Sequence, residues 1–176
     1  MHSIEGSKTE PKLSLRKPNR EDGAGIWTLI AACRPLDENS MYCNLIQCDH
    51  FRDTCVVAEL DGEIVGWVSA YLMPDDPETM FVWQVAVSEK ARGRGLGARM
   101  LDHIIARDTC GEVTRIQTTI TIDNDASWAL FGRFGKARGA RLRTQPYFIR
   151  EDHFDGHHAT EHMLTIDFAS ELERAA

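Results

Sequence analysis

The sequence predicts an α/β fold: a single domain with one mixed, twisted sheet flanked by helices. Three observations lead to this prediction. The chain has 176 residues, which fits one domain with a real core. Hydrophobic residues make up 43% of it and charged residues 27%, so it belongs with ordinary globular proteins. Segments with the periodicity of a strand alternate along the chain with segments of helical periodicity.

The first third of the chain is predicted to hold a short strand and two helices. Residues 13–17 form the strand, and a helix follows over residues 21–33, with Asn19 as the expected cap. Residues 36–49 are predicted as a loop and a second helix.

The clearest hairpin comes next. Two β-rich runs, 54–60 and 63–72, are joined by Asp61-Gly62, which is a strong signal for a two-residue turn. Two prolines then break the chain near residue 75, before a nearly continuous apolar strand at 80–87. The remaining elements are predicted as a helix at 98–107, a strand at 113–122, a helix at 126–134 and strands at 140–149 and 160–168. We expect a disordered lead at 1–12, one domain at 13–168 and a tail at 169–176.

Composition narrows the class of protein. The five cysteines are odd in number and include no Cys-x-x-Cys pair, so we expect reduced thiols rather than disulfides or a metal site. The amino terminus lacks the apolar stretch of a secretory signal, and no apolar run approaches the roughly 20 residues of a membrane span, so we expect a cytoplasmic protein. The formal net charge of −7 disfavours nucleic-acid binding and is compatible with a cationic substrate or with simple solubility.

The most informative motif is a strand followed by a glycine-rich turn and a helix. Val85-Ala86-Val87 leads into a turn made of Arg92, Gly93, Arg94, Gly95, Leu96 and Gly97. Glycines let the backbone approach a ligand, and a helix amino terminus presents free N–H groups and positive potential. This pattern predicts an anion cradle, and a pyrophosphate is the expected guest. The ending of a P-loop and the spacing of a dinucleotide-binding turn are both missing.

With this motif the chain resembles the GCN5-related N-acetyltransferase (GNAT) family, whose signature Gln/Arg-x-x-Gly-x-Gly/Ala matches Arg92, Gly95 and Gly97. The later order of strand, Asn124 and short helix agrees as well. The resemblance implies this family's fold over residues 13–168 and acetyl-coenzyme A as cosubstrate. It also implies that the pantetheine arm pairs with the backbone at Val85 and Val87, with Asn124 and Phe131 nearby. Many members place a proton-donating tyrosine at the position of Phe131, which has no hydroxyl, so either another group donates or the thiolate leaves unaided.

Three further segments are similar to the L-2,4-diaminobutyrate acetyltransferases. They are residues 36–43 (LDENSMYC), 81–87 (FVWQVAV) and 158–166 (HATEHMLTI). This resemblance implies transfer of acetyl to the gamma amine of L-2,4-diaminobutyrate, a step of ectoine biosynthesis used against osmotic stress. It also implies a homodimer.

The residue chemistry of these segments suits a diamino acid. Asp37 and Glu161 can pair with ammonium groups, and Trp83 can offer an aromatic wall. Tyr42 and Asn124 can hydrogen-bond the substrate or a water. Glu161 or His162 is the expected base, and the backbone N–H near Val85 is expected to hold the oxyanion. A metal cluster of His157, His158 and His162 is disfavoured, because residues 158 and 162, four apart in a strand or loop, do not share a helical face.

Two alternatives stay open at this point. The chain could acetylate another small amine, such as a polyamine, ornithine or lysine. It could also be a non-catalytic regulator that binds acyl-coenzyme A, which the missing tyrosine makes conceivable.

Overall fold

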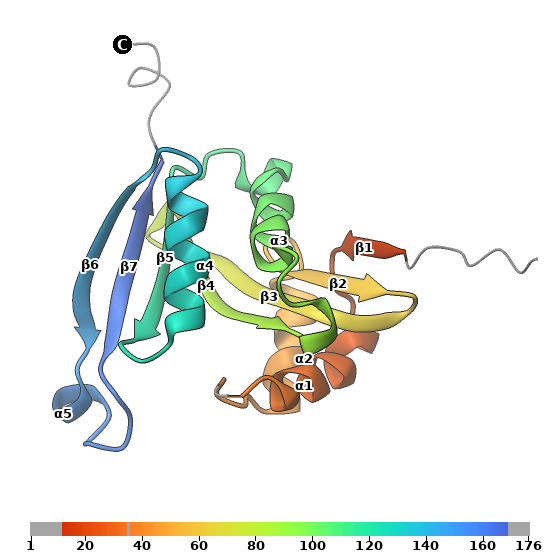
Figure 1. The fold of residues 1–176 in the computed structure, drawn as a ribbon, viewed down its shortest axis with the longest axis horizontal. Helices are drawn as coiled ribbons and strands as arrows, with labels where there is room; N and C mark the ends of the chain where they lie inside the picture. Colours follow the sequence, from red (N-terminus) through yellow and green to blue (C-terminus); the bar gives the residue numbers. More distant parts are fainter. Residues whose placement is uncertain (1–11, 35, 169–176) are drawn as a thin grey trace, which may run out of the picture.

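The structure, a computed structural model that describes residues 12–34 and 36–168, contains a seven-stranded sheet (Figure 1). The strands are β1 (Leu13–Arg16), β2 (Val56–Leu60), β3 (Glu63–Met73), β4 (Asp76–Val87), β5 (Arg115–Thr121), β6 (Arg141–Phe148) and β7 (Glu161–Asp167). Their order in the sheet is β1-β2-β3-β4-β5-β7-β6. β4 and β5 are parallel and the other neighbours antiparallel, which confirms the predicted mixed sheet.

Five α-helices accompany the sheet in this part of the chain: α1 (Gly23–Ala32), α2 (Met41–His50), α3 (Leu96–Ile105), α4 (Asp125–Lys136) and α5 (Arg150–His153). Short 3-10 helices lie at η1 (Arg20–Asp22), η2 (Glu89–Ala91) and η3 (Asp108–Cys110). The predicted order of strands and longer helices is confirmed. The hairpin turn is confirmed too, because Asp61 and Gly62 have the positive φ values, 51° and 86°, that a two-residue turn requires.

Three details differ from the prediction. Helix α5 was not predicted, because four residues are too few to show a helical period. Asn19 caps η1 by accepting a hydrogen bond from the Glu21 backbone, so α1 begins later, at Gly23. Strand β4 begins at Asp76 rather than at residue 80, because a proline near the first residues of a strand, here Pro77, is compatible with pairing.

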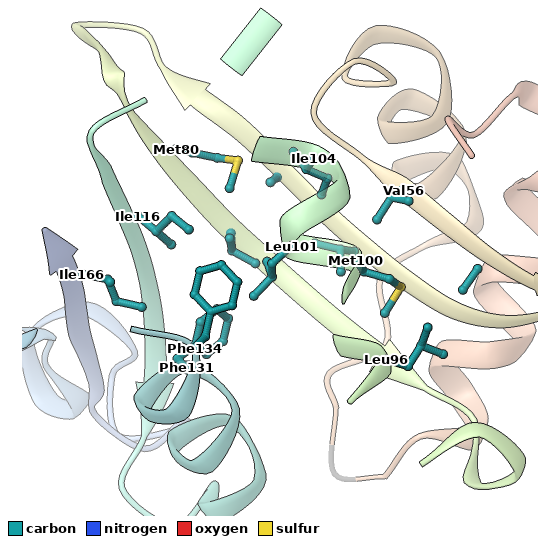
Figure 2. Close-up of a cluster of buried hydrophobic side chains, with 14 of the residues drawn as sticks. Val56, Met80, Leu96, Met100, Leu101, Ile104, Ile116, Phe131, Phe134 and Ile166 are labelled. Atoms are coloured by element: carbon teal, nitrogen blue, oxygen red, sulfur yellow. The ribbon is translucent and has the colours of Figure 1, made fainter. Parts of the chain in front are cut away.

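Helices cover the sheet on both faces and divide the core in two. Helices α3 and α4 pack on one face, where Leu101, Phe134 and Ile116 belong to the larger cluster (Figure 2). Helices α1 and α2 lie on the other face, and α1 contacts β3 and β4 there, with Ile26 and Trp67 fully buried between them. Burial of this apolar surface is the main source of stability.

The sheet separates in its middle. β4 and β5 pair only over residues 79–81 and 115–117, near the start of each strand. Trp83 is an extra residue in β4, because Gln84 pairs with Ser69 while Val82 pairs with the next residue of β3. A bulge bends a strand and increases its twist, so β4 turns away from β5 beyond this point. The two strands therefore open a cleft at their carboxyl ends.

The predicted disordered lead at residues 1–12 and the tail at 169–176 lie outside the described residues, except for Lys12. The Lys12 backbone N–H donates to the Asp61 carboxylate at 3.0 Å. Across the described helices, none has the length and apolar character needed to cross a membrane.

Candidate active site

Two cavities meet in the cleft between β4 and β5. The larger, about 1010 Å³, runs along the glycine-rich turn and between α3 and α4. The smaller, about 350 Å³, lies between the carboxyl ends of β4 and β5, the loop before α2 and the start of β7. Both are lined by Leu36, Val85, Asn124 and Ser127. Any group that passes from a ligand in one cavity to a ligand in the other must pass these four residues.

The larger cavity has the expected anion cradle at one end. Gly93 and Gly95 have φ values of +74° and +68°, which side chains with a Cβ rarely adopt, so glycine is required at both positions. The turn ends at the amino terminus of α3, which has no side-chain cap among the described residues. Its free backbone N–H groups and the helix dipole can therefore face a pyrophosphate. Gly97 has a separate role, because a Cβ there would lie 3.0 Å from Leu130 of α4.

Eight of the ten residues predicted to bind the cofactor line the larger cavity. The larger cavity is lined by Val85, Val87, Arg92, Gly93, Gly95, Leu96, Gly97 and Asn124. The predicted Arg94 does not line it, and its side chain is exposed on the turn. Phe131 lines the smaller cavity instead, where it is 2% exposed.

At Val85, the backbone of β4 can pair with a ligand along the cleft. The Ser88 N–H donates to the Val65 carbonyl of β3 at 2.8 Å, whereas the Val87 carbonyl accepts from Arg92 Nε at 3.0 Å, away from β3. Successive residues of a strand direct their backbone groups to opposite edges. The N–H and C=O of Val85, two residues before Val87, therefore point away from β3 into the cleft. An extended amide-containing ligand can pair there as an added strand.

The smaller cavity holds two carboxylates with an imidazole between them. His158 Nε2 lies 3.3 Å from Asp37 Oδ2 and 3.9 Å from Glu161 Oε1. The hydrogen bond of His158 Nδ1 with the Ala159 carbonyl, at 2.7 Å, raises the pKa of the imidazole, and the two carboxylates raise it further. His158 therefore keeps its proton to a higher pH than an unperturbed imidazole does. Trp83 forms another wall and remains 47% exposed.

Glu161 has the environment of a base. Burial raises the pKa of its carboxyl group above the usual range, although the charge of His158 opposes this. Its Oε2 atom is buried and has no hydrogen-bond partner within the described structure. A carboxylate that lines a cavity and has a raised pKa can accept a proton from an ammonium group.

The loop that carries Asp37 is tied to β4. Gln84 Nε2 donates to the Asp37 carbonyl at 2.8 Å, and Gln84 Oε1 accepts from Asn39 Nδ2 at 3.2 Å. Gln84 is 8% exposed, so water competes little for these bonds. The Asp37 carboxylate is thereby held over the cavity while its side chain stays largely exposed.

Besides Arg94, two predicted residues are not brought to either cavity. Tyr42 lies on α2 and is 72% exposed. His162 stands directly opposite Ile120 in the β5–β7 ladder, and opposite residues point to the same face. Because Ile120 is part of the core, His162 points toward the helix side, where its Nδ1 is buried and has no hydrogen-bond partner in the described structure.

Several lining residues were not predicted as site residues. They are Leu36, Asn39, Gln84, Thr118, Thr119, Thr121, Asp123, Ser127 and His158. The threonines had a visible signal, because residues 119 and 121 alternate along a predicted strand whose end faces the cleft. Ser127 had none, since a serine in the first turn of a helix is ordinary. No group of three or more His, Cys, Asp or Glu side chains suited to a metal ion occurs in residues 12–34 and 36–168.

Comparisons with known proteins agree with this geometry. Residues 24–136 match the model of the acetyltransferase (GNAT) family. An L-2,4-diaminobutyric acid acetyltransferase from Methylotuvimicrobium alcaliphilum is 47% identical over 156 residues, which cover 89% of this chain and 91% of the relative. The protein of the same name from Vibrio cholerae is 44% identical over a match that covers 89% of this chain and 90% of that relative.

A solved structure also resembles the chain closely. It is the diaminobutyrate acetyltransferase EctA from Paenibacillus lautus, in complex with its substrate L-2,4-diaminobutyric acid and coenzyme A. The TM-score is 0.86 at 35% identity, and the match covers 92% of this chain and 99% of the other. Fold, cradle geometry, family match and these relatives lead to one conclusion: the chain belongs to the acetyltransferase (GNAT) family and, within it, to the family of the L-2,4-diaminobutyric acid acetyltransferases.

Proposed function

We propose that this chain transfers the acetyl group of acetyl-coenzyme A to the gamma amine of L-2,4-diaminobutyrate, giving N-gamma-acetyl-diaminobutyrate for ectoine biosynthesis. One observation carries the proposal: the cluster of Asp37, His158 and Glu161 lines a cavity that opens, at Val85, onto the cofactor groove. A substrate with two ammonium groups and one carboxylate needs acceptors for the first and a cationic donor for the second. This cluster contains both.

The reaction needs a base, because a free amine of this kind has a pKa near 10 and is protonated at neutral pH. Glu161 takes this proton, directly or through a water, with its raised pKa and its unpartnered Oε2. Bound acetyl-coenzyme A supplies the electrophilic thioester carbonyl. The Val85 N–H donates to the oxyanion that forms when the amine attacks, since it points into the cleft where the two cavities meet. His162 is not favoured as the base, because it points to the other face of β7.

Substrate orientation follows from the remaining groups. Asp37 binds the ammonium group that does not react, and protonated His158 binds the substrate carboxylate. Trp83 covers the carbon chain and can make a cation–π contact with an ammonium group. Asn124 Oδ1 accepts the Ser127 backbone N–H at 3.1 Å, and the Asn124 Nδ2 can donate to substrate or water.

The test is thiol release from acetyl-coenzyme A by the purified protein, with diaminobutyrate, ornithine, lysine and spermidine offered separately. Rapid release with diaminobutyrate and little with the others supports the proposal, and NMR of the product locates the acetyl group. Activity on another amine alone keeps the acetyltransferase and rejects this substrate. Tight cofactor binding without release for any amine would instead favour the regulator.

The cytoplasm as location, a role in osmotic stress and a homodimer belong to the same proposal. Support for the homodimer comes from the sheet face that carries α1 and α2, because these helices cover only its β2–β4 side (Figure 1). An aromatic row continues there from Phe51 through Tyr71 to Phe81, with ring centroids 6.1 and 5.3 Å apart. Trp83, two residues after Phe81 in β4, is 47% exposed. A second copy of the chain can bury these rings; light scattering of the purified protein measures its mass in solution.

A further inference from the structure

The leaving sulfur cannot receive a proton from a tyrosine at the position that supplies one in many family members. The position at which many family members carry a tyrosine is Phe131, a buried ring without a hydroxyl. When the tetrahedral intermediate collapses, negative charge moves onto the sulfur. A group that stabilises this charge has to lie where both cavities meet, because the thioester joins the cofactor arm to the acetyl group.

Among residues 12–34 and 36–168, four line both cavities, and one of these four carries a hydroxyl. Leu36 and Val85 have apolar side chains, and the carboxamide oxygen of Asn124 caps α4. Ser127 lies in the first turn of α4, one helical turn before Phe131, so the two residues share a face of the helix.

The Ser127 hydroxyl is free to bind a ligand. Serine and threonine in a helix often donate to the carbonyl four residues earlier, as Thr28 does to Ala24 at 3.0 Å. The Ser127 backbone N–H donates to Asn124 Oδ1 at 3.1 Å, and within the described residues the Ser127 Oγ has no hydrogen-bond partner. The amino terminus of α4 also adds positive potential at this point.

We propose that the Ser127 hydroxyl donates a hydrogen bond to the thioester sulfur and stabilises the leaving thiolate, in place of the tyrosine that Phe131 replaces. The carbon–sulfur bond breaks, its electron pair moves to sulfur, and Ser127 keeps its proton. Glu161 already holds the first proton of the ammonium group, so the nitrogen of the new amide loses its remaining extra proton to water. The released thiolate takes up a proton from solvent, and Glu161 returns its proton to solvent before the next turnover. This role for Ser127 rests on the acetyl transfer proposed above.

The first test measures the ionisation of bound coenzyme A without any turnover. Thiolate absorbance is titrated with pH for the protein loaded with coenzyme A, and the titration with desulfo-coenzyme A is subtracted to remove the protein's own cysteines. Ser127→Ala is expected to raise the pKa of the bound thiol by about one unit, a tenfold change in its ionisation constant. The affinity for coenzyme A at a pH where the thiol is neutral should not change. An equal thiol pKa in both proteins overturns the proposal.

The second test is the rate. With diaminobutyrate, Ser127→Ala should lower kcat by about 10-fold, the effect of one hydrogen bond to a charged atom, and leave KM for the amine unchanged. Ser14→Ala on the exposed edge strand β1 is the matched control and should equal the parent protein. A change in KM alone would indicate a structural role and contradict the proposal.

The two proposals fail in different ways. If the parent protein acetylates diaminobutyrate and Ser127→Ala behaves identically, the role of Ser127 is wrong and the proposed function stands. If the parent protein uses only another amine, the proposed substrate is wrong, and the thiol titration still decides the role of Ser127.

Discussion

Replacing Glu161 with glutamine tests the chemistry of the site most directly. The amide keeps the size of the side chain and cannot take a proton. General-base catalysis typically contributes about 10²- to 10⁴-fold, so kcat with diaminobutyrate should fall by that factor, equivalent to about 3–5 kcal/mol of activation free energy. Binding of acetyl-coenzyme A should not change, because Glu161 lines only the smaller cavity.

The pH profile gives a second readout. Burial raises the pKa of the Glu161 carboxyl, and only the carboxylate can act as base. Activity of the parent protein should therefore fall as pH drops through this raised pKa, and this acidic limb should be missing from the residual activity of Glu161→Gln.

The same substitution should stabilise the fold at neutral pH. A raised pKa in the folded state means that the folded protein holds the proton more tightly, so stability falls as pH rises from the unfolded pKa, about 4.3, through the folded one. A buried oxygen without a partner costs about 1–3 kcal/mol, and more when charged, so removing the charge should regain about 1 kcal/mol. For a chain of this size that is an increase in Tm of about 2–4 °C, which vanishes in acid.

Glu63→Gln is the matched control, since Glu63 pairs with Lys90 on the surface and touches neither cavity. It should leave kcat unchanged. The reasoning is refuted if Glu161→Gln keeps kcat within about threefold of the parent and retains the acidic limb, because a base worth at least about 100-fold would then lie elsewhere.

Three other substitutions probe the cradle, the loop and the fold. Gly95→Ala places a Cβ at a φ of +68°, which costs about 1–2 kcal/mol. Calorimetry should therefore show that the variant binds coenzyme A about 10-fold more weakly. Gly132→Ala, a position with open space around it, is the control and should not weaken binding. Gln84→Leu removes both hydrogen bonds that hold the Asp37 loop, so KM for diaminobutyrate should rise about 10-fold with a smaller change in kcat; an unchanged KM would show that the loop is held otherwise. Arg16→Met leaves Asp22 buried without its bidentate partner and should cost about 3 kcal/mol at neutral pH by chemical denaturation. Although burial alone would raise the pKa of Asp22, its bonds to Arg16 and the Asn19 backbone lower it overall, so this cost should shrink as pH falls below about 4; a cost independent of pH would contradict the assignment.

The sequence alone determined the parts of this protein that depend on local backbone preferences. The hairpin turn at Asp61-Gly62 and the glycine cradle at 93–95 were predicted because only a few residue types tolerate positive φ. The order of the longer elements followed from periodicity, which short helices such as α5 do not show. The sequence also predicted that side chains alternate between the two faces of the strand that contains Glu161 and His162. Because neighbouring residues of a strand point to opposite faces, only one of these two side chains could face the cleft.

The tertiary structure decided which of the predicted residues meet. Asp37, His158 and Glu161 come from two distant segments, and their approach depends on the separation of β4 from β5 and on the bond from Gln84 that holds the loop. Tyr42 faces solvent because the packing of α2 as a whole sets the direction of this side chain. The position of Ser127 at the junction of the two cavities also depends on the tertiary structure. Such contacts arise from long-range pairing and packing, which no short stretch of sequence encodes.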